Sequence, residues 1–120
     1  MIYTAKVHWI VSGKEETHGD TVLVDRLWPR GIPKEALHLD FWMKDVAPSP
    51  ELRRWWAHDP QTFPEFRKRY EQELESNSSD DLRQLRYLTA HGDVSLVFAA
   101  HDPEINHAVV LADWLKASAQ

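Results

Sequence analysis

Three short apolar segments dominate the pattern of the chain and predict its strands. In residues 2–11 apolar side chains alternate with polar ones, a period of two that is typical of a strand with one wetter face. Residues 21–27 and 94–100 are nearly continuous apolar runs, which indicate strands buried on both faces of a sheet covered by helices. We therefore expect strands near 2–11, 21–27 and 94–100.

Proline marks two helix starts between the second and third of these strands. Pro33 suits the first position of a short helix that ends near Leu39. Ser49 and Pro50 form a stronger start, because serine caps a helix and proline fits its first turn. Residues 41–48, between these two helices, are expected to be an irregular connection.

The clearest helical periodicity lies in residues 64–75. Apolar side chains recur there at every fourth position and form one helix face: Phe66, Tyr70 and Leu74. Such a face needs apolar cover. We expect it to share one core with Trp42 and Trp55.

Two more helices are expected in the last third of the chain. Ser78 and Asp81 resemble a capping box that opens a helix ending at His91-Gly92. Asp102 caps a final helix from Pro103 to about Ala117.

A strand followed by a helical crossover and another buried strand favours an α/β fold. We expect a single domain over residues 1–120, with a small, partly parallel sheet flanked by helices.

Composition narrows the class of protein. The chain has no cysteine, so disulfides, thiolate metal sites and a cysteine nucleophile are excluded. No apolar run reaches the roughly 20 residues that span a bilayer, and the N-terminus lacks the pattern of a signal peptide. These features predict a soluble, cytoplasmic protein with no membrane partner.

Charge is distributed unevenly along the chain. The net charge is −5, yet residues 26–69 hold nine basic and six acidic side chains, so this segment is +3 and the remainder is −8. Four of the six tryptophans fall between residues 28 and 56, among those basic groups. A basic centre in an acidic shell favours a local anion site over a broad surface for nucleic acid.

Polar residues follow two of the predicted strands, where α/β folds bind their ligands. Arg26 and Arg30 follow the second strand and are candidate anion donors, with Asp25 as an acceptor or base. His107, near the start of the last helix, is a candidate acid or base. If the two strands are parallel neighbours, these side chains meet at one edge of the sheet. We expect Arg26, Arg30 and His107 to line one pocket, with Asn106 at its wall.

Structural interpretations of the same residues remain open. Asp25 and Arg26 also fit a structural ion pair, and Asp102 fits a simple helix cap. His58-Asp59-Pro60 and His101-Asp102-Pro103 resemble paired His-Asp metal motifs, although Asp-Pro is common at helix starts. No spacing typical of a metal site supports the metal interpretation.

The segment 22–31, Val-Leu-Val-Asp-Arg-Leu-Trp-Pro-Arg-Gly, resembles the YeaO-like family, the short branch of the bacterial proteins classed as domain of unknown function 488. The resemblance continues through much of residues 34–74 and 95–108. His101 departs from it, standing where the family usually has lysine or arginine, and Trp56 stands where phenylalanine is frequent. The family is functionally uncharacterised. Its pattern nevertheless contains many residues that are poor core choices, which implies a shared polar site made of Asp25, Arg26, Trp28, Arg30, Lys34, Lys44, Arg53, His58, Asn106 and His107.

Three hypotheses for function follow. The first is binding of, or catalysis on, a small anionic ligand that resembles a phosphate or nucleotide, with Asp25 and His107 as candidate catalytic residues. The second is a nucleic-acid-binding or regulatory module. The third is a metal-dependent hydrolase that uses His58, His101 and His107. The motifs indicate no particular cofactor and no oligomeric state.

Overall fold

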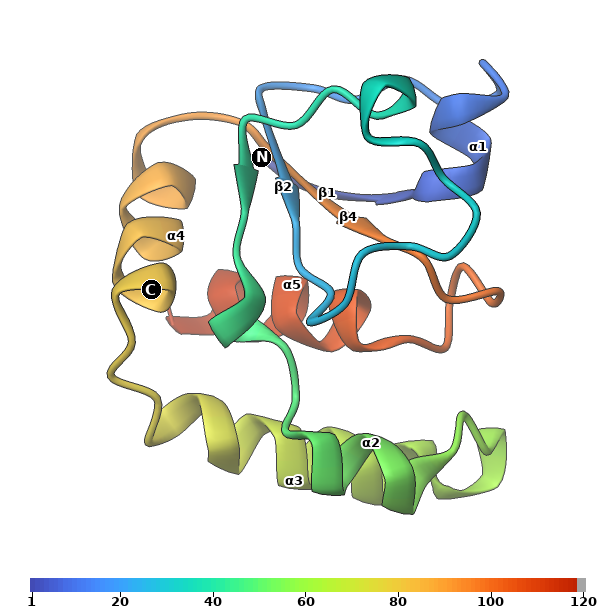
Figure 1. Ribbon diagram of the computed structural model, residues 1–120. Helices are drawn as coiled ribbons and strands as arrows, with labels where there is room; N and C mark the ends of the chain where they lie inside the picture. The colour runs from blue at the N-terminus through green and yellow to red at the C-terminus, as the bar shows by residue number, and fades with distance from the viewer. Residues whose placement is uncertain (119–120) are drawn as a thin grey trace.

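A four-stranded parallel sheet forms the centre of the computed structural model, which describes residues 1–118 (Figure 1). The strands are β1 (Ile2–Lys6), β2 (Asp20–Leu23), β3 (Phe41–Trp42) and β4 (Val94–Phe98), in the order β1-β4-β2-β3. All three neighbouring pairs are parallel. The α/β class is therefore confirmed, with a sheet that is parallel throughout.

Helices cover the sheet unequally. The helices are α1 (Val7–Val11), α2 (Pro50–Trp56), α3 (Phe63–Glu75), α4 (Asp80–His91) and α5 (His107–Ser118). Three short 3-10 turns, η1 (Lys34–Ala36), η2 (Lys44–Val46) and η3 (Pro60–Thr62), lie in the connections. In Figure 1, α5 lies between the sheet and the pair α2–α3, whereas α1 follows directly from β1.

The alternation of side chains in β4 divides the core into two parts. Leu96 and Phe98 belong to the larger cluster, which the helices α2 to α5 complete. Val97 points to the other face and packs with Leu23 and Val7, under the segment between β2 and β3. Both faces of the sheet are thus covered, as the continuous apolar runs predict.

The first predicted strand is too long, because the structure changes from β1 to α1 after Lys6. Residues 7–11 fit both periods: they alternate as a strand does, but Val7 and Ile10 also lie three apart on one helix face. Both side chains pack in the smaller cluster, and this tertiary contact decides for the helix.

The predicted second strand is also too long, because β2 ends at Leu23 rather than Leu27. The Val24 N–H still donates to the Val97 carbonyl at 3.1 Å. One position further, Asp25 Oδ2 accepts a hydrogen bond from Ala99 N at 2.9 Å. In a continuing strand, a backbone carbonyl would be the acceptor there. The strand ladder therefore ends on a side chain.

Sequence reasoning missed β3, which falls inside the connection expected over residues 41–48. It has two residues, too few to show a period, and it pairs with Val22 and Leu23. The helix expected over 33–39 is only the short turn η1, in which Lys34–Ala36 follow an extended Pro33.

The final helix begins at His107, four residues later than expected. Asp102 Oδ1 accepts from the N–H groups of Glu104 and Ile105, closing a separate turn. These bonds lower the pKa of Asp102 below its usual value. Asn106 Oδ1 then accepts from Val109 N at 3.0 Å and caps the helix itself. Similarly, α4 is capped by Ser79 rather than Ser78.

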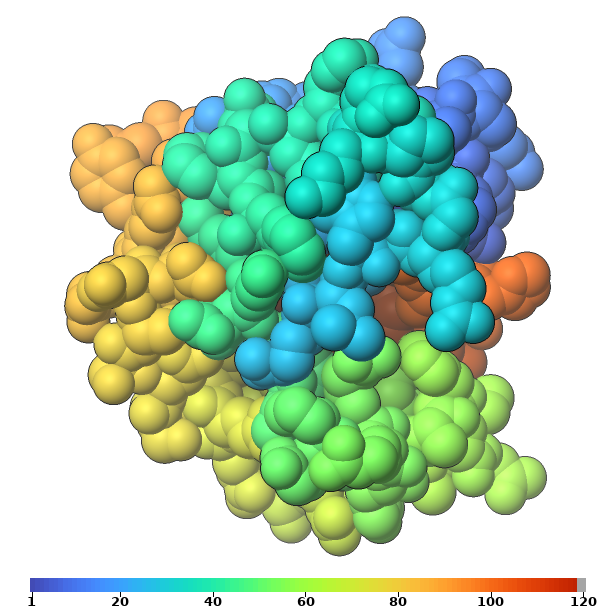
Figure 2. Space-filling model, viewed as in Figure 1, coloured from blue at the N-terminus to red at the C-terminus, as the bar shows by residue number. Residues whose placement is uncertain are grey.

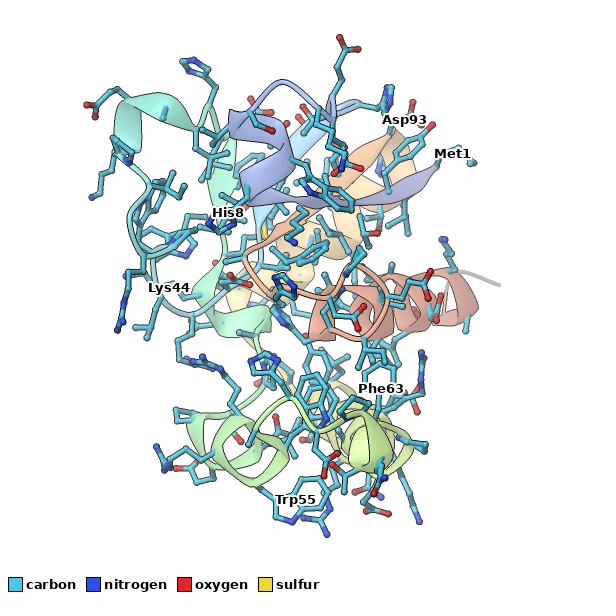
Figure 3. All side chains as sticks on the ribbon, turned by 90° about the vertical axis from the view of Figure 1, so that its right-hand side faces the viewer. Met1, His8, Lys44, Trp55, Phe63 and Asp93 are labelled. Carbon is cyan, nitrogen blue, oxygen red and sulfur yellow. The ribbon has the colours of Figure 1, made fainter. Side chains whose placement is uncertain are left out.

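The apolar face of α3 is confirmed, but its predicted cover is wrong. Phe66, Tyr70 and Leu74 are fully buried in the larger cluster. Trp42 packs in the smaller cluster instead, and Trp55 is 43% exposed at the edge of the molecule (Figure 3). The neighbouring Trp56 covers this face instead of Trp55, and its ring stacks on Phe66 with centroids 4.0 Å apart.

Candidate functional site

A cavity of about 260 Å³ opens at the carboxyl edge of β2 and β4. Figure 2 shows the surface hollowed between the blue-to-cyan segment after β2 and the green segment of α2. Its walls come from residues 25–30, 47–48 and 99–100, from α2 and the turn after it, and from the first residue of α5. Because β2 and β4 are parallel neighbours, the segments that follow them meet here.

Asp25 and His107 lie side by side in the lining of this cavity. Asp25 Oδ2 accepts from Ala99 N, and its Oδ1 lies 3.1 Å from His107 Nε2. The same Nε2 lies 3.0 Å from the Val24 carbonyl oxygen. A carbonyl oxygen can only accept a hydrogen bond, so His107 Nε2 carries a proton and donates to the Val24 carbonyl. Asp25 Oδ1 is buried and has no hydrogen-bond partner among residues 1–118. The pair ties the ends of β2 and β4 to the start of α5.

Arg26 crosses one wall of the cavity. Its Nη2 donates to the Ala47 carbonyl at 3.3 Å and lies 3.5 Å from the Pro48 carbonyl. Its Nη1 is 3.9 Å from Asp45, while its buried Nε has no hydrogen-bond partner within residues 1–118. Arg26 therefore fixes the 47–48 segment and adds positive charge at the wall.

Arg30 and Arg53 line the same cavity with exposed side chains. Arg30 stands in the proline-rich turn after β2, and Arg53 stands on α2. The side-chain ion pairs found in the described part of the chain involve other arginines. Both guanidinium groups are thus left without a carboxylate partner there.

His58 reaches the cavity through an unusual turn. Ala57 and His58 both have positive φ angles, 49° and 58°, although neither is glycine. The His58 ring packs against the Trp56 ring, with centroids 4.9 Å apart. Partial burial lowers the pKa of His58 below its ordinary value of 6.5, and the charges of Arg53 and His107 lower it further, while Asp25 opposes them.

Trp28 supplies the aromatic wall. Its Nε1 donates to the Ile32 carbonyl at 2.6 Å, which fixes the orientation of the ring. Its edge also packs against Trp42, with ring centroids 5.4 Å apart.

Three of the predicted site residues lie outside the cavity lining: Lys34, Lys44 and Asn106. The Nζ atoms of Lys34 and Lys44 lie over the rings of Trp28 and Trp42, at 5.8 and 4.2 Å from the centroids. Asn106 is fully buried and caps α5, so its place in the family pattern has a structural reason.

Sequence reasoning missed the small residues that leave room for the cavity. Ala47, Pro48, Ala99 and Ala100 all line it. Their signal was present, since each pair of small residues stands beside a helix start or a strand end.

Among residues 1–118, no group of three or more His, Asp or Glu side chains is arranged to hold a metal ion. His58 and His107 face the cavity, but His101 does not line it; its backbone carbonyl accepts from Lys6 Nζ at 2.6 Å. In the same described range, no helix has the length and apolar character that crossing a membrane requires.

The fold and cavity define a parallel α/β protein with a cationic pocket at the carboxyl edge of its sheet. Residues 1–120 match DUF488-N3i, described as the inactive DUF488-N3 subclade, and the chain belongs to this family. It is 40% identical over 103 residues to the uncharacterised protein YeaO of Escherichia coli K12, covering 86% of this chain and 89% of YeaO. It is 46% identical over 97 residues to the uncharacterised protein Rv3073c of Mycobacterium tuberculosis H37Rv, covering 81% and 80% of the two chains. No solved structure matches.

Proposed function

We propose that the protein binds a small anionic ligand, phosphate- or nucleotide-like, in the cavity at the carboxyl edge of β2 and β4. One observation carries this proposal: the cavity lining contains three arginines and a single aspartate, which gives it a net charge of +2 when the histidines are neutral. The aspartate carboxylate reduces this positive charge but does not cancel it, because three guanidinium groups line the same cavity.

Arg30 and Arg53 suit the role of anion donors. A guanidinium group presents a rigid fork of N–H donors that matches a phosphate or carboxylate group. Both side chains are exposed at the cavity and lack a carboxylate partner in the described part of the chain. The cavity of about 260 Å³ is slightly smaller than the roughly 300–1,000 Å³ typical of sites for drug-sized ligands. A sugar phosphate or a nucleoside monophosphate fits this size better than a dinucleotide.

Binding is favoured over catalysis by two observations. The family that contains this chain is described as an inactive subclade. In addition, Asp25 and His107, the candidate acid and base, both hold backbone groups of neighbouring segments. We propose that these two residues position the cavity walls rather than transfer protons.

Titration calorimetry and thermal shift with inorganic phosphate, sulfate and nucleoside monophosphates test the proposal. A ligand at ~100 times its Kd stabilises the protein by ~2.7 kcal/mol. Arg30→Ala and Arg53→Ala should each weaken binding at least tenfold. Arg54→Ala is the matched control, because Arg54 is an exposed arginine of α2 outside the cavity lining.

Other outcomes would replace the proposal. Tight oligonucleotide binding with a steep salt dependence, and no response to small anions, would favour the nucleic-acid module. Co-purified zinc whose binding depends on His58, His101 and His107 would favour the metal-dependent hydrolase. The proposal keeps the cytoplasmic location expected from the sequence, which cell fractionation tests.

A further inference from the structure

We propose that His58 is a proton-linked specificity residue of this cavity: it gains a proton when a doubly charged anionic group binds. The site would then prefer dianions, such as a phosphate monoester, to monoanions of similar shape, and would hold them more tightly at acidic pH. This inference rests on the proposed function, because it concerns the same cavity and the same class of ligand.

The first support is the backbone that places His58. Ala57 and His58 are consecutive non-glycine residues in the left-handed region, where L-residues are disfavoured by contact between Cβ and the backbone. Such conformations persist when the surrounding structure holds them, and they concentrate at functional sites. Here Ala57 N donates to the Arg53 carbonyl and Asp59 N to the Trp56 carbonyl, so hydrogen bonds fix both sides of the turn.

The turn has a consequence for the site. It ends α2 abruptly and reverses the chain before Pro60 opens η3. His58 therefore lines the same cavity as Arg53, which stands one turn earlier in the helix. Glycine would adopt this backbone without strain, and the residue that stands here is instead a histidine that lines the cavity.

The second support is the charge around the ring. The groups that act on His58 are Arg53 from α2, His107 from α5 and Asp25 after β2, and Arg26 and Arg30 line the same cavity. Cationic neighbours outnumber the single carboxylate, and partial burial also disfavours a charged ring. The pKa of His58 is lowered accordingly, so the ring is neutral in the free protein at neutral pH.

An anion in the cavity reverses this balance. Two negative charges placed among Arg30, Arg53 and His58 favour the imidazolium form, so binding takes up a proton. By linkage, affinity then changes by up to about tenfold per pH unit between the pKa values of the free and the bound protein. A monoanion supplies half the charge and gives a weaker dependence.

Calorimetry with inorganic sulfate between pH 5.5 and 8.0 tests this inference, because sulfate remains a dianion throughout that range. We expect sulfate affinity to fall about tenfold across this range in the unmodified protein. In His58→Asn it should change less than about twofold, since asparagine tolerates the left-handed region but does not titrate. His38→Asn, an exposed histidine outside the cavity lining, should keep the full dependence.

Two further measurements sharpen the test. Methyl sulfate, a monoanion of similar shape, should bind more weakly than sulfate and with a flatter pH profile. NMR titration of the His58 ring should show its pKa rising by about one unit when sulfate is added, since tenfold in affinity corresponds to one pKa unit.

The possible failures are distinguishable. If sulfate binds with a requirement for Arg30 but His58→Asn keeps the same pH profile, the role of His58 is wrong and the proposed function stands. If sulfate, phosphate and nucleoside monophosphates all fail to bind at any pH, both proposals are overturned. The strain has its own readout: His58→Ala and His58→Gly both remove the ring, so the thermal midpoint should be higher for His58→Gly than for His58→Ala, and an equal or lower midpoint for His58→Gly would contradict the argument from the turn.

Discussion

Asp25 shows how one side chain can hold the walls of the cavity together. Its two oxygens contact different segments, Ala99 after β4 and His107 at the start of α5. Such a role is invisible in the sequence, where an aspartate after a strand reads equally well as a base, an ion-pair partner or an acceptor. The position of the residue was predictable from the strand pattern, but its partners are set by the order of the strands in the sheet.

Replacing Asp25 should therefore reduce stability. Asp25→Ala leaves the Ala99 N–H without its acceptor in a partly buried place, which should cost about 1–3 kcal/mol in the free energy of unfolding. Urea denaturation followed by fluorescence measures this loss. Asp25→Asn keeps an oxygen for Ala99 and should lose less. Equal stability of Asp25→Ala and the unmodified protein would show that the contact to Ala99 contributes nothing.

The helix α3 shows which elements a sequence can predict. Its apolar face repeats every four residues over three turns, and the structure buries all three side chains. The tryptophan that covers this face was misassigned, since Trp55 and Trp56 are adjacent and only one can face inward. Leu52 and Trp56 are both buried at a spacing of four, a signal that was available in the sequence and was not used.

We expect Phe66, on the buried face of α3, to contribute strongly to the stability of the protein. It is completely buried, stacks on Trp56 and contacts Tyr70, so Phe66→Ala should cost about 3–5 kcal/mol. Thermal and urea unfolding would both report this change. Phe63→Ala, in the same helix but half-buried, should cost clearly less. A loss below about 1 kcal/mol for Phe66→Ala would mean that the core closes around the missing ring.

Shorter elements escaped prediction for physical reasons. A strand of two residues such as β3 has no detectable period, and its existence depends on its neighbour β2. The start of α5 depends on a competition between two capping residues, Asp102 and Asn106, each of which binds nearby N–H groups. Propensity favours both sites, and only the packing of the whole helix decides where the regular hydrogen bonds begin.

At the scale of the whole molecule, two buried or partly buried groups should limit stability at opposite ends of the pH range. The pKa of His58 is lowered in the folded protein, so the unfolded chain takes up the proton first as the pH falls below about 6.5, and stability decreases. Burial raises the pKa of Tyr70 well above 10.0, so the unfolded chain loses its proton first as the pH rises above about 10, and stability decreases again.

Thermal midpoints measured from pH 5 to 11 without added anion test both limits. His58→Asn should reduce the loss between pH 7 and 5. Tyr70→Phe should lower stability at neutral pH, because the Val46 carbonyl loses its donor, but it should flatten the loss above pH 10. Profiles parallel to that of the unmodified protein would rule out these two groups as the cause.

The parallel arrangement of the sheet explains why the site was partly predictable. Two strands of the same direction bring the residues that follow them to one edge, and this alone joins residues 25–30 to residues 99–100. The contributions of Arg53 and His58 depend on how α2 lies beneath the sheet, which no local pattern reveals. The resemblance to a family, rather than any periodicity, marked those two residues.

The position of β4 has a consequence for how the protein folds during its synthesis. This strand lies between β1 and β2, yet residues 24–93 separate it from β2 along the chain. A ribosome makes β1, β2 and β3 first, and until residues 94–98 have emerged β1 has no partner strand and β2 pairs only with the two-residue β3. The helices α2, α3 and α4 can form locally before β4 is made. The edges of β1 and β2 that face β4 remain unpaired during this time, and such edges pair readily with other nascent chains. The sheet can therefore be completed only after β4 has been synthesised. A nascent chain that stops before residue 94 exposes the edges of β1 and β2 that β4 covers in the folded protein.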